Sequence, residues 1–353
     1  MSNLETRPAE RTCSAGDRPA GVELLTARDV PLGGPRAMTV RRTIPQRQRS
    51  LVGAWCFCDH YGPDDVSPSG GRPEGMQVPP HPHTGLQTVS WLFAGEILHR
   101  DSVGSLQAVR PGELNLMTAG VGISHSEESP AQGRPPVLHG VQLWTVLPEA
   151  DRQAEPHFEH HGDLPVATPD GGRVQVFMGE LGVVGANGVE SERLVSPART
   201  YTPLVGAQLD LPAGGRVTLE TDPTFEHALL VDAGDATLEG EAVPPAELGY
   251  VAPGRDRLVV TAGASPVRAV LLGGEPFTED VVMWWNFVGG THDDVARARA
   301  DWMAQVADAG EGTPTRYADG AAGRRFGEVH GYASGPLRAP VLPDVRLRPR
   351  TRR

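Results

Sequence analysis

Glycine and proline interrupt the apolar residues of this chain at short, irregular intervals, and this feature restricts its fold more than any other. The 353 residues include 43 Gly and 33 Pro, with no fixed period that would indicate a collagen-like repeat. Short apolar runs between Gly and Pro turns are typical of β-sandwiches and barrels. We therefore expect an all-β fold, with strands at residues 38–43, 86–92, 140–147 and 268–272 among others.

Two stretches in opposite halves of the chain resemble each other. Trp91-Leu-Phe-Ala-Gly-Glu in the first half is similar to Leu230-Val-Asp-Ala-Gly-Asp in the second, and a Pro-Gly turn follows each of them. Self-similarity of this kind indicates repetition of one structural unit. We interpret it as a sign of two consecutive barrels.

The domain order follows from changes in composition along the chain. We expect a flexible arm at residues 1–22, an N-terminal barrel at 23–148, a polar connector at 149–165 and a second barrel at 166–340. Residues 341–353 form a basic tail. One helix is expected within the second unit, at residues 291–307. Thr291 can cap its start, and Asp293 and Asp294 suit the positive end of the helix dipole.

Charge and cysteine content limit the partners and the location. The net charge is -12, which disfavours direct contact with nucleic acid. We interpret the arginine-rich tail as a solvated terminus. An odd, small number of cysteines suits a reducing compartment, and we interpret Cys56 and Cys58 as buried core thiols rather than a thiolate pair. With neither a signal peptide nor a membrane-spanning run, a cytoplasmic location without membrane contact is expected. The residues concerned are Cys13, Cys56 and Cys58, and Arg346, Arg348, Arg350, Arg352 and Arg353.

Two pairs of potential metal ligands carry the strongest chemical signal. His81 and His83 are two residues apart, as are His125 and Glu127, and on a strand such residues point to the same face. Three imidazoles and one carboxylate suit a divalent transition metal such as Fe, Mn, Ni or Cu. Two adjacent coordination positions would stay open for a substrate and dioxygen. The alternative is that these are ordinary polar loop residues.

Several motifs together resemble the pirin family of the cupin superfamily. They cover roughly residues 25 to 340, most densely around the histidine pairs, and their resemblance implies two consecutive cupin barrels (double-stranded β-helices, or jelly rolls) and a short C-terminal helix. The motifs are His81-Pro-His-Thr-Gly-Leu-Gln-Thr-Val, Gly95-Glu-Ile-Leu-His-Arg-Asp-Ser-Val-Gly, Pro111-Gly-Glu, Met117-Thr-Ala-Gly-Val-Gly-Ile-Ser-His-Ser-Glu, Leu138-His-Gly-Val-Gln-Leu-Trp and Met283-Trp-Trp-Asn-Phe-Val.

The resemblance also implies a ligand set. It consists of His81, His83, His125 and Glu127, with Fe(II) the usual ion and Mn, Ni, Cu, Co or Zn as alternatives. Three other residues are not ligands in the family pattern, namely His99, Asp101 and His60. This chain departs from the family at Gln87, where many pirins carry Glu, so we interpret Gln87 as at most a pocket residue. His227 stands alone in the second barrel, where no metal site is expected.

The family supports two functions of different kinds. Some pirins open flavonols such as quercetin with dioxygen, and here Glu127 would take the proton of the flavonol 3-hydroxyl. Other pirins are redox-sensitive regulators that bind transcription or metabolic proteins. Val89, Trp91 and Met117 are interpreted as either cavity lining or core, whereas Trp144, Trp284 and Trp285 are interpreted as core. The histidines of the connector, His157, His160 and His161, are expected to have no function.

Overall fold

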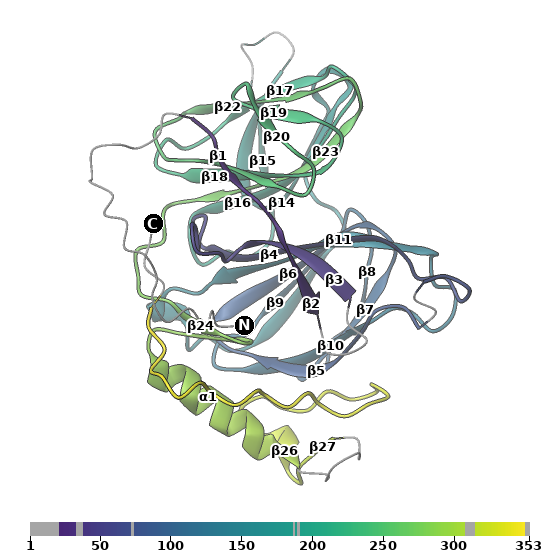
Figure 1. The fold of residues 1–353 in the computed structure, drawn as a ribbon, viewed down its shortest axis with the longest axis vertical. Helices are drawn as coiled ribbons and strands as arrows, with labels where there is room; N and C mark the ends of the chain where they lie inside the picture. The colour runs from purple at the N-terminus through teal and green to yellow at the C-terminus, as the bar shows by residue number, and fades with distance from the viewer. Residues whose placement is uncertain are drawn as a thin grey trace.

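The computed structural model describes residues 21–32, 38–71, 74–185, 188, 191–307 and 315–349. It contains two stacked β-barrels and a single α-helix within these ranges (Figure 1). The expected all-β fold with two cupin barrels and a short C-terminal helix is confirmed. The predictions for Cys13, for most of the N-terminal arm and for Arg350, Arg352 and Arg353 lie outside the described residues. Within the described part of the chain, no helix has the length and hydrophobicity to span a bilayer.

The first barrel consists of two antiparallel sheets that face each other. One sheet supplies most of the core and contacts the second barrel, and the other carries the histidine pairs. The larger sheet has the order β12 (His157–His161), β9 (Leu114–Thr118), β6 (Leu86–Ala94), β11 (Val137–Val146), β4 (Trp55–Asp65), β3 (Met38–Ile44) and β2 (Arg28–Leu32). The smaller sheet has the order β5 (Gln77–His83), β10 (Ile123–Glu128), β7 (Ile97–Asp101) and β8 (Leu106–Val109).

The second barrel is one curled sheet. Its order is β1 (Glu23–Leu25), β21 (Leu248–Val251), β18 (Glu226–Ala233), β23 (Val267–Gly274), β16 (Leu204–Leu211), β14 (Arg173–Val184), β17 (Arg216–Glu220), β22 (Arg257–Ala262), β19 (Ala236–Leu238) and β20 (Glu241–Val243). Two further strands pair with β14, namely β13 (Val166–Ala167) and β15 (Ser191–Val195). The repeated motif falls at equivalent turns, because β6 and β18 are each followed directly by a glycine with positive φ, Gly95 and Gly234.

Two short strands cross the expected domain boundaries. Strand β1 precedes the first barrel in the chain, yet it pairs with β21 of the second barrel. Strand β12 lies in the range expected to be a connector, yet it pairs with β9 of the first barrel. The domain boundaries given above stay a prediction. Strand β1 ties the start of the chain to the second barrel, in addition to the contact between the two barrels.

The helix α1 (His292–Gln305) lies outside the barrels, next to the first one (Figure 1). Thr291 is its N-cap and forms a capping box with Asp294, as the sequence predicted. The helix buries Trp302 and is preceded by the hairpin β24 (Val282–Trp284) and β25 (Phe287–Gly289). Strands β26 (Val306–Ala307) and β27 (Arg316–Tyr317) follow it, and 3₁₀ turns occur at Glu149–Asp151, Pro169–Gly171 and Ala321–Gly323.

The last described residues run between α1 and strand β5, and we call residues 335–347 the C-terminal segment. The Leu337 N–H donates to the carbonyl of Pro80, which is next to His81, at 2.7 Å. The Trp302 indole of α1 donates to the carbonyl of Leu337 at 2.8 Å. Prolines at 336, 340 and 343 restrict the backbone of the segment. It is therefore a fixed part of the wall around the histidine-bearing sheet.

The joint between the barrels is apolar and includes specific hydrogen bonds. The indole of Trp55 donates to the carbonyls of Val205 and Gly273, both at 3.1 Å. The ring of Trp91 stacks on Phe177 with centroids 4.7 Å apart. These rings belong to one buried cluster that contains residues of both barrels. Burial of several large aromatic side chains makes this joint a main source of stability.

Candidate metal site

Strands β5 and β10 pair directly and bring the two motifs together. In their antiparallel register His81 lies opposite His125, and His83 lies opposite Ile123. A bulge between His125 and Glu127 shifts the register with β5. All four predicted residues, His81, His83, His125 and Glu127, line one cavity of about 520 Å³. The expectation that each pair points to one side therefore agrees with their placement.

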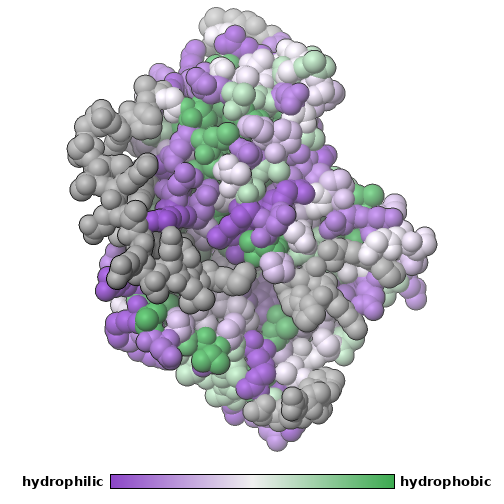
Figure 2. Space-filling view, viewed as in Figure 1, coloured by the Kyte–Doolittle hydropathy of each residue, from purple (hydrophilic) through white to green (hydrophobic). Residues whose placement is uncertain are grey.

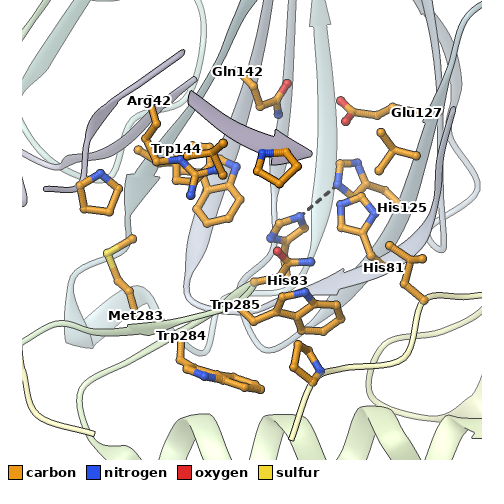
Figure 3. Close-up of a pocket in the computed structure, with 18 of the residues that line it drawn as sticks. Arg42, His81, His83, His125, Glu127, Gln142, Trp144, Met283, Trp284 and Trp285 are labelled. Atoms are coloured by element: carbon orange, nitrogen blue, oxygen red, sulfur yellow. Dashed lines mark hydrogen bonds between the residues drawn. The ribbon is translucent and has the colours of Figure 1, made fainter. Parts of the chain in front are cut away.

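Three imidazoles meet at the closed end of this cavity (Figure 3). The ring centroids of His81 and His125 lie 4.4 Å apart, and both lie 5.0 Å from the ring of His83. The Nε2 atoms of His83 and His125 are separated by 3.1 Å. Two nitrogen ligands about 2.1 Å from one ion, at right angles to each other, would lie about 3.0 Å apart. The spacing thus fits adjacent positions on a metal ion.

Burial keeps these imidazoles neutral. The exposed fractions of His81, His83 and His125 are 7%, 1% and 1%. Burial lowers the pKa of His81 to about 4, and it lowers the pKa of His83 and of His125 well below the usual value. Neutral imidazoles have a free lone pair for coordination at physiological pH. The donor set therefore fits a divalent transition metal.

Glu127 lies beyond His125 as seen from His83 (Figure 3). Burial raises the pKa of its carboxyl group, with smaller opposing effects from His99 and the Ser90 hydroxyl. Ser90 Oγ donates to Glu127 Oε1 at 3.2 Å. A carboxylate oxygen of Glu127 lies close enough to ring nitrogens of His99 and His125 for the three to bind one metal ion. His81, His83 and His125 form a separate group of this kind. His125 thus belongs to two groups of potential ligands.

Aromatic residues line the walls of the cavity. Trp144 is buried in the core, as interpreted, and its ring also lines the cavity, where it stacks on Phe57 with centroids 4.0 Å apart. The guanidinium of Arg42 lies 4.1 Å from the Phe57 centroid and forms a bidentate pair with Asp59. Trp284 and Trp285 line the cavity as well. The reason is that the hairpin β24–β25 lies across the open end of the first barrel, which no local pattern reveals.

The residues expected either in the cavity or in the core belong to the core. Val89, Trp91 and Met117 are buried in the cluster that joins the barrels and are not among the residues that line the cavity. Gln87 is also buried, and its amide donates to Thr118 Oγ1 and to the carbonyl of Arg199. Cys56 and Cys58 are buried and form no disulfide within the described residues, as interpreted. Burial raises the pKa of Cys58 to about 12, so it stays protonated.

A second cluster of potential ligands lies between the barrels, consisting of His60, His139 and Asp232. Arg41 and Arg268 donate toward the Nδ1 atoms of His60 and His139 at 3.4 and 3.3 Å. Each Nδ1 therefore accepts, and each Nε2 carries the proton that it donates to Asp232. Two guanidinium groups and two protonated Nε2 atoms disfavour a divalent cation there.

The remaining histidines have local partners. His227 is buried in the second barrel, and burial lowers its pKa to about 4. His160 contacts Asn115 Oδ1 at 2.6 Å, and His161 contacts Glu159 at 3.1 Å. Within the described residues, the groups with metal-ligand geometry do not include His157, His160, His161 or His227.

Two cupin barrels in one chain, with a histidine-lined cavity in the first, define a two-barrel protein of the cupin superfamily. The chain belongs to the pirin family, since the Pirin family model matches residues 37–145 and the Pirin C-terminal cupin domain matches residues 206–307.

Similar proteins occur in several bacteria. A Pseudomonas aeruginosa protein named "Putative quercetin 2,3-dioxygenase" is 40% identical over 97% of this chain and 98% of its own length. A pirin-like protein of Caulobacter vibrioides is 36% identical over 75% of this chain and 88% of its own. A crystal structure titled quercetin 2,3-dioxygenase from Acinetobacter baumannii is 35% identical, with a TM-score of 0.77 over 93% of this chain and 98% of its own. These similarities extend across both barrels.

Proposed function

We propose that this protein is a mononuclear metal-dependent dioxygenase that acts on flavonols such as quercetin. His81, His83, His125 and Glu127 would bind the ion, most suitably Fe(II). The observation that carries the proposal is the group of three buried, neutral imidazoles at the end of an aromatic-walled cavity. The cavity volume of about 520 Å³ lies in the range usual for small-molecule sites. The names of the Pseudomonas and Acinetobacter relatives support the same substrate class.

The chain's own residues would position the substrate and move one proton. The stacked pair of Phe57 and Trp144 offers a flat surface to the flavonol rings. Glu127 would accept the proton of the 3-hydroxyl group, since burial raises the pKa of its carboxyl. Ser90 Oγ lies 3.2 Å from one oxygen of that carboxylate and 3.0 Å from Oε1 of Gln142. When bound, the ion would supply Lewis acidity and redox chemistry with dioxygen.

A turnover assay tests the proposed activity. The protein is loaded with Fe(II) without oxygen, then mixed with air and quercetin while the flavonol absorbance is followed. We expect loaded protein to consume quercetin and dioxygen in equal amounts and to release carbon monoxide. Glu127→Gln should lower kcat by at least about 100-fold because it removes the base.

Apoprotein serves as the blank, and the iron content of each sample is measured separately. Loss of iron from Glu127→Gln would mean that the lower kcat reflects the role of Glu127 as a ligand and not its role as a base. If wild-type protein binds one iron and quercetin persists, the dioxygenase proposal is wrong.

The alternative is a redox-sensitive protein that binds transcription or metabolic proteins. The net charge of -12 favours a protein partner over nucleic acid. On the face shown in Figure 2, the described hydrophobic residues form small separate patches among hydrophilic ones. A partner on that face would bind through polar contacts. Binding that differs between the Fe(II) and Fe(III) forms would support this alternative. The reduced, buried state of Cys56 and Cys58 suits the cytoplasmic location that both functions imply.

The C-terminal segment should limit the size of the substrate that the cavity can accept. Its residues Leu337, Pro340, Val341 and Pro343 line the cavity, and the prolines limit its withdrawal. We expect Val341→Trp to raise the KM for quercetin by about tenfold or more, because the larger side chain occupies space that the substrate needs.

Val345→Trp is the matched control. Val345 lies in the same segment and is 67% exposed, compared with 83% for Val341, but it is not among the residues that line the cavity. Its KM should equal that of wild type. Equal KM values for wild type and Val341→Trp would mean that the segment does not limit the substrate.

A further inference from the structure

A buried chain of polar side chains lies behind His125, outside the cavity. His125 Nδ1 is 3.4 Å from His99 Nδ1, and His99 Nε2 is 3.1 Å from Asp101 Oδ2. The exposed fractions of Asp101, His99 and His125 are 4%, 2% and 1%. Strands β7 and β10 fix the arrangement, because His125 pairs with Asp101 and Glu127 pairs with His99 in their register.

Packing and backbone contacts hold these three hydrogen-bonded side chains in place. Asp101 Oδ1 accepts from the backbone N–H groups of Val103 and Ser105 at 3.1 and 2.9 Å, so its other oxygen faces His99. The ring of His99 stacks on Phe158 of β12, with centroids 4.6 Å apart and an interplanar angle of 21°. The carboxylate and the imidazole plane are thus both fixed.

Only one set of proton positions is compatible with a metal bound through His125 Nε2. That atom faces His83 Nε2 and must offer its lone pair, so Nδ1 of His125 must carry the proton. Nδ1 of His99 must then accept, and its Nε2 must donate to Asp101. The ionised carboxylate of Asp101 can only accept a hydrogen bond, so it requires a proton on Nε2 of His99. It therefore favours this set of proton positions.

We propose that Asp101 and His99 are positioning residues that hold His125 in the tautomer needed for metal binding. The inference rests on the proposed metal site and assigns to these residues a role outside the ligand set. Partners of this kind orient metal-binding histidines and raise their basicity.

His99 itself is the competing candidate for a ligand, since it groups with His125 and Glu127. The cavity favours the positioning role. His81, His83, His125 and Glu127 line it, but His99 is not among its lining residues. A metal held by His99 would lie behind His125, away from the space that can receive a substrate.

Asp101→Asn tests the proposal because it should reverse the direction of both hydrogen bonds between residue 101, His99 and His125. The two backbone N–H groups at Oδ1 require the amide oxygen there, so the amide NH₂ must face His99. His99 would then accept through Nε2 and donate through Nδ1, which moves the proton of His125 to Nε2. We expect the affinity for Fe(II) to fall about 10- to 100-fold, measured anaerobically against a competing chelator.

The tautomer is measured directly by ¹⁵N NMR of the histidine rings in metal-free protein. We expect the Nδ1–H form of His125 in wild type and the Nε2–H form in Asp101→Asn. Glu128→Gln is the control, since it makes the same carboxylate-to-amide change in β10 at a residue paired with Arg100. It should keep the wild-type tautomer and affinity.

The outcomes separate this inference from the proposed activity. An Nε2–H form of His125 in wild type, or an unchanged tautomer and affinity in Asp101→Asn, would overturn the positioning role. If Asp101→Asn does not fold, the wild-type spectrum alone decides the matter. A wild type that binds iron but leaves quercetin intact would refute the dioxygenase and leave the positioning role standing.

Discussion

Replacing His83 by alanine should lower the affinity for Fe(II) by about 100- to 1,000-fold. His83 lies between the other two imidazoles of the group and the cavity wall, with its ring 5.1 Å from Trp144. Four-ligand structural zinc sites provide about 10–16 kcal/mol, so one ligand contributes roughly a quarter of that value. Each 1.4 kcal/mol corresponds to about a factor of ten in affinity.

The measurement is an anaerobic titration of apoprotein with Fe(II) against a chelator. His227→Ala is the matched control, because His227 is also 1% exposed and neutral but lies in the second barrel. It should bind iron as wild type does, although it loses a buried side chain. At the same concentration, iron should also raise the melting temperature of wild type and of His227→Ala by more than that of His83→Ala. Stoichiometric binding of unchanged affinity by His83→Ala would exclude His83 as a ligand.

Local sequence signals predicted the repeated elements of the fold and the two residue pairs that the structure places at one cavity. The two-residue spacing of His81 and His83 predicts that both face one side of a strand, and β5 places both at the cavity. Thr291 and Asp294 form the capping box that starts the helix at the expected residue. Each of these features depends on neighbours within a few residues, and for this reason the sequence reveals it.

Features that depend on contacts distant in sequence could not be predicted. Trp284 and Trp285 reach the cavity because the hairpin that carries them returns from the second barrel to the first. The exchange of β1 into the second barrel and the course of the C-terminal segment have the same origin. The spacing of His99 and Asp101 was noticed, but its meaning depends on the register of β7 with β10.

Asp232→Ala should destabilise the protein by about 3–5 kcal/mol, the usual cost of removing one partner from a buried ion pair. Asp232 lies in the second barrel, and its Oδ1 is 2.6 Å from Nε2 of His60 and of His139, both in the first. Arg268 Nε donates to Oδ2 at 2.6 Å. Truncation leaves the Nε–H of Arg268 and two buried imidazole N–H groups without the acceptor that they share. Because these groups belong to both barrels, the decrease in the free energy of unfolding reports how strongly the two barrels are joined.

The pH dependence and a control make this prediction specific. Its histidine and arginine partners hold the pKa of Asp232 well below the usual value, even though burial acts to raise it. Its contribution is therefore present above the unfolded pKa of about 3.9 and is lost as the pH falls below it. Urea unfolding of the metal-free protein should show a constant difference between wild type and Asp232→Ala from pH 5 to pH 8. Glu220→Ala, which removes a carboxylate 3.5 Å from Arg257 at the surface of the same barrel, should change stability by less than about 1 kcal/mol. A loss for Asp232→Ala as small as that of Glu220→Ala would mean that the joint is held by its apolar contacts, chiefly those around Trp55 and Trp91, and that the buried cluster serves only to align the barrels.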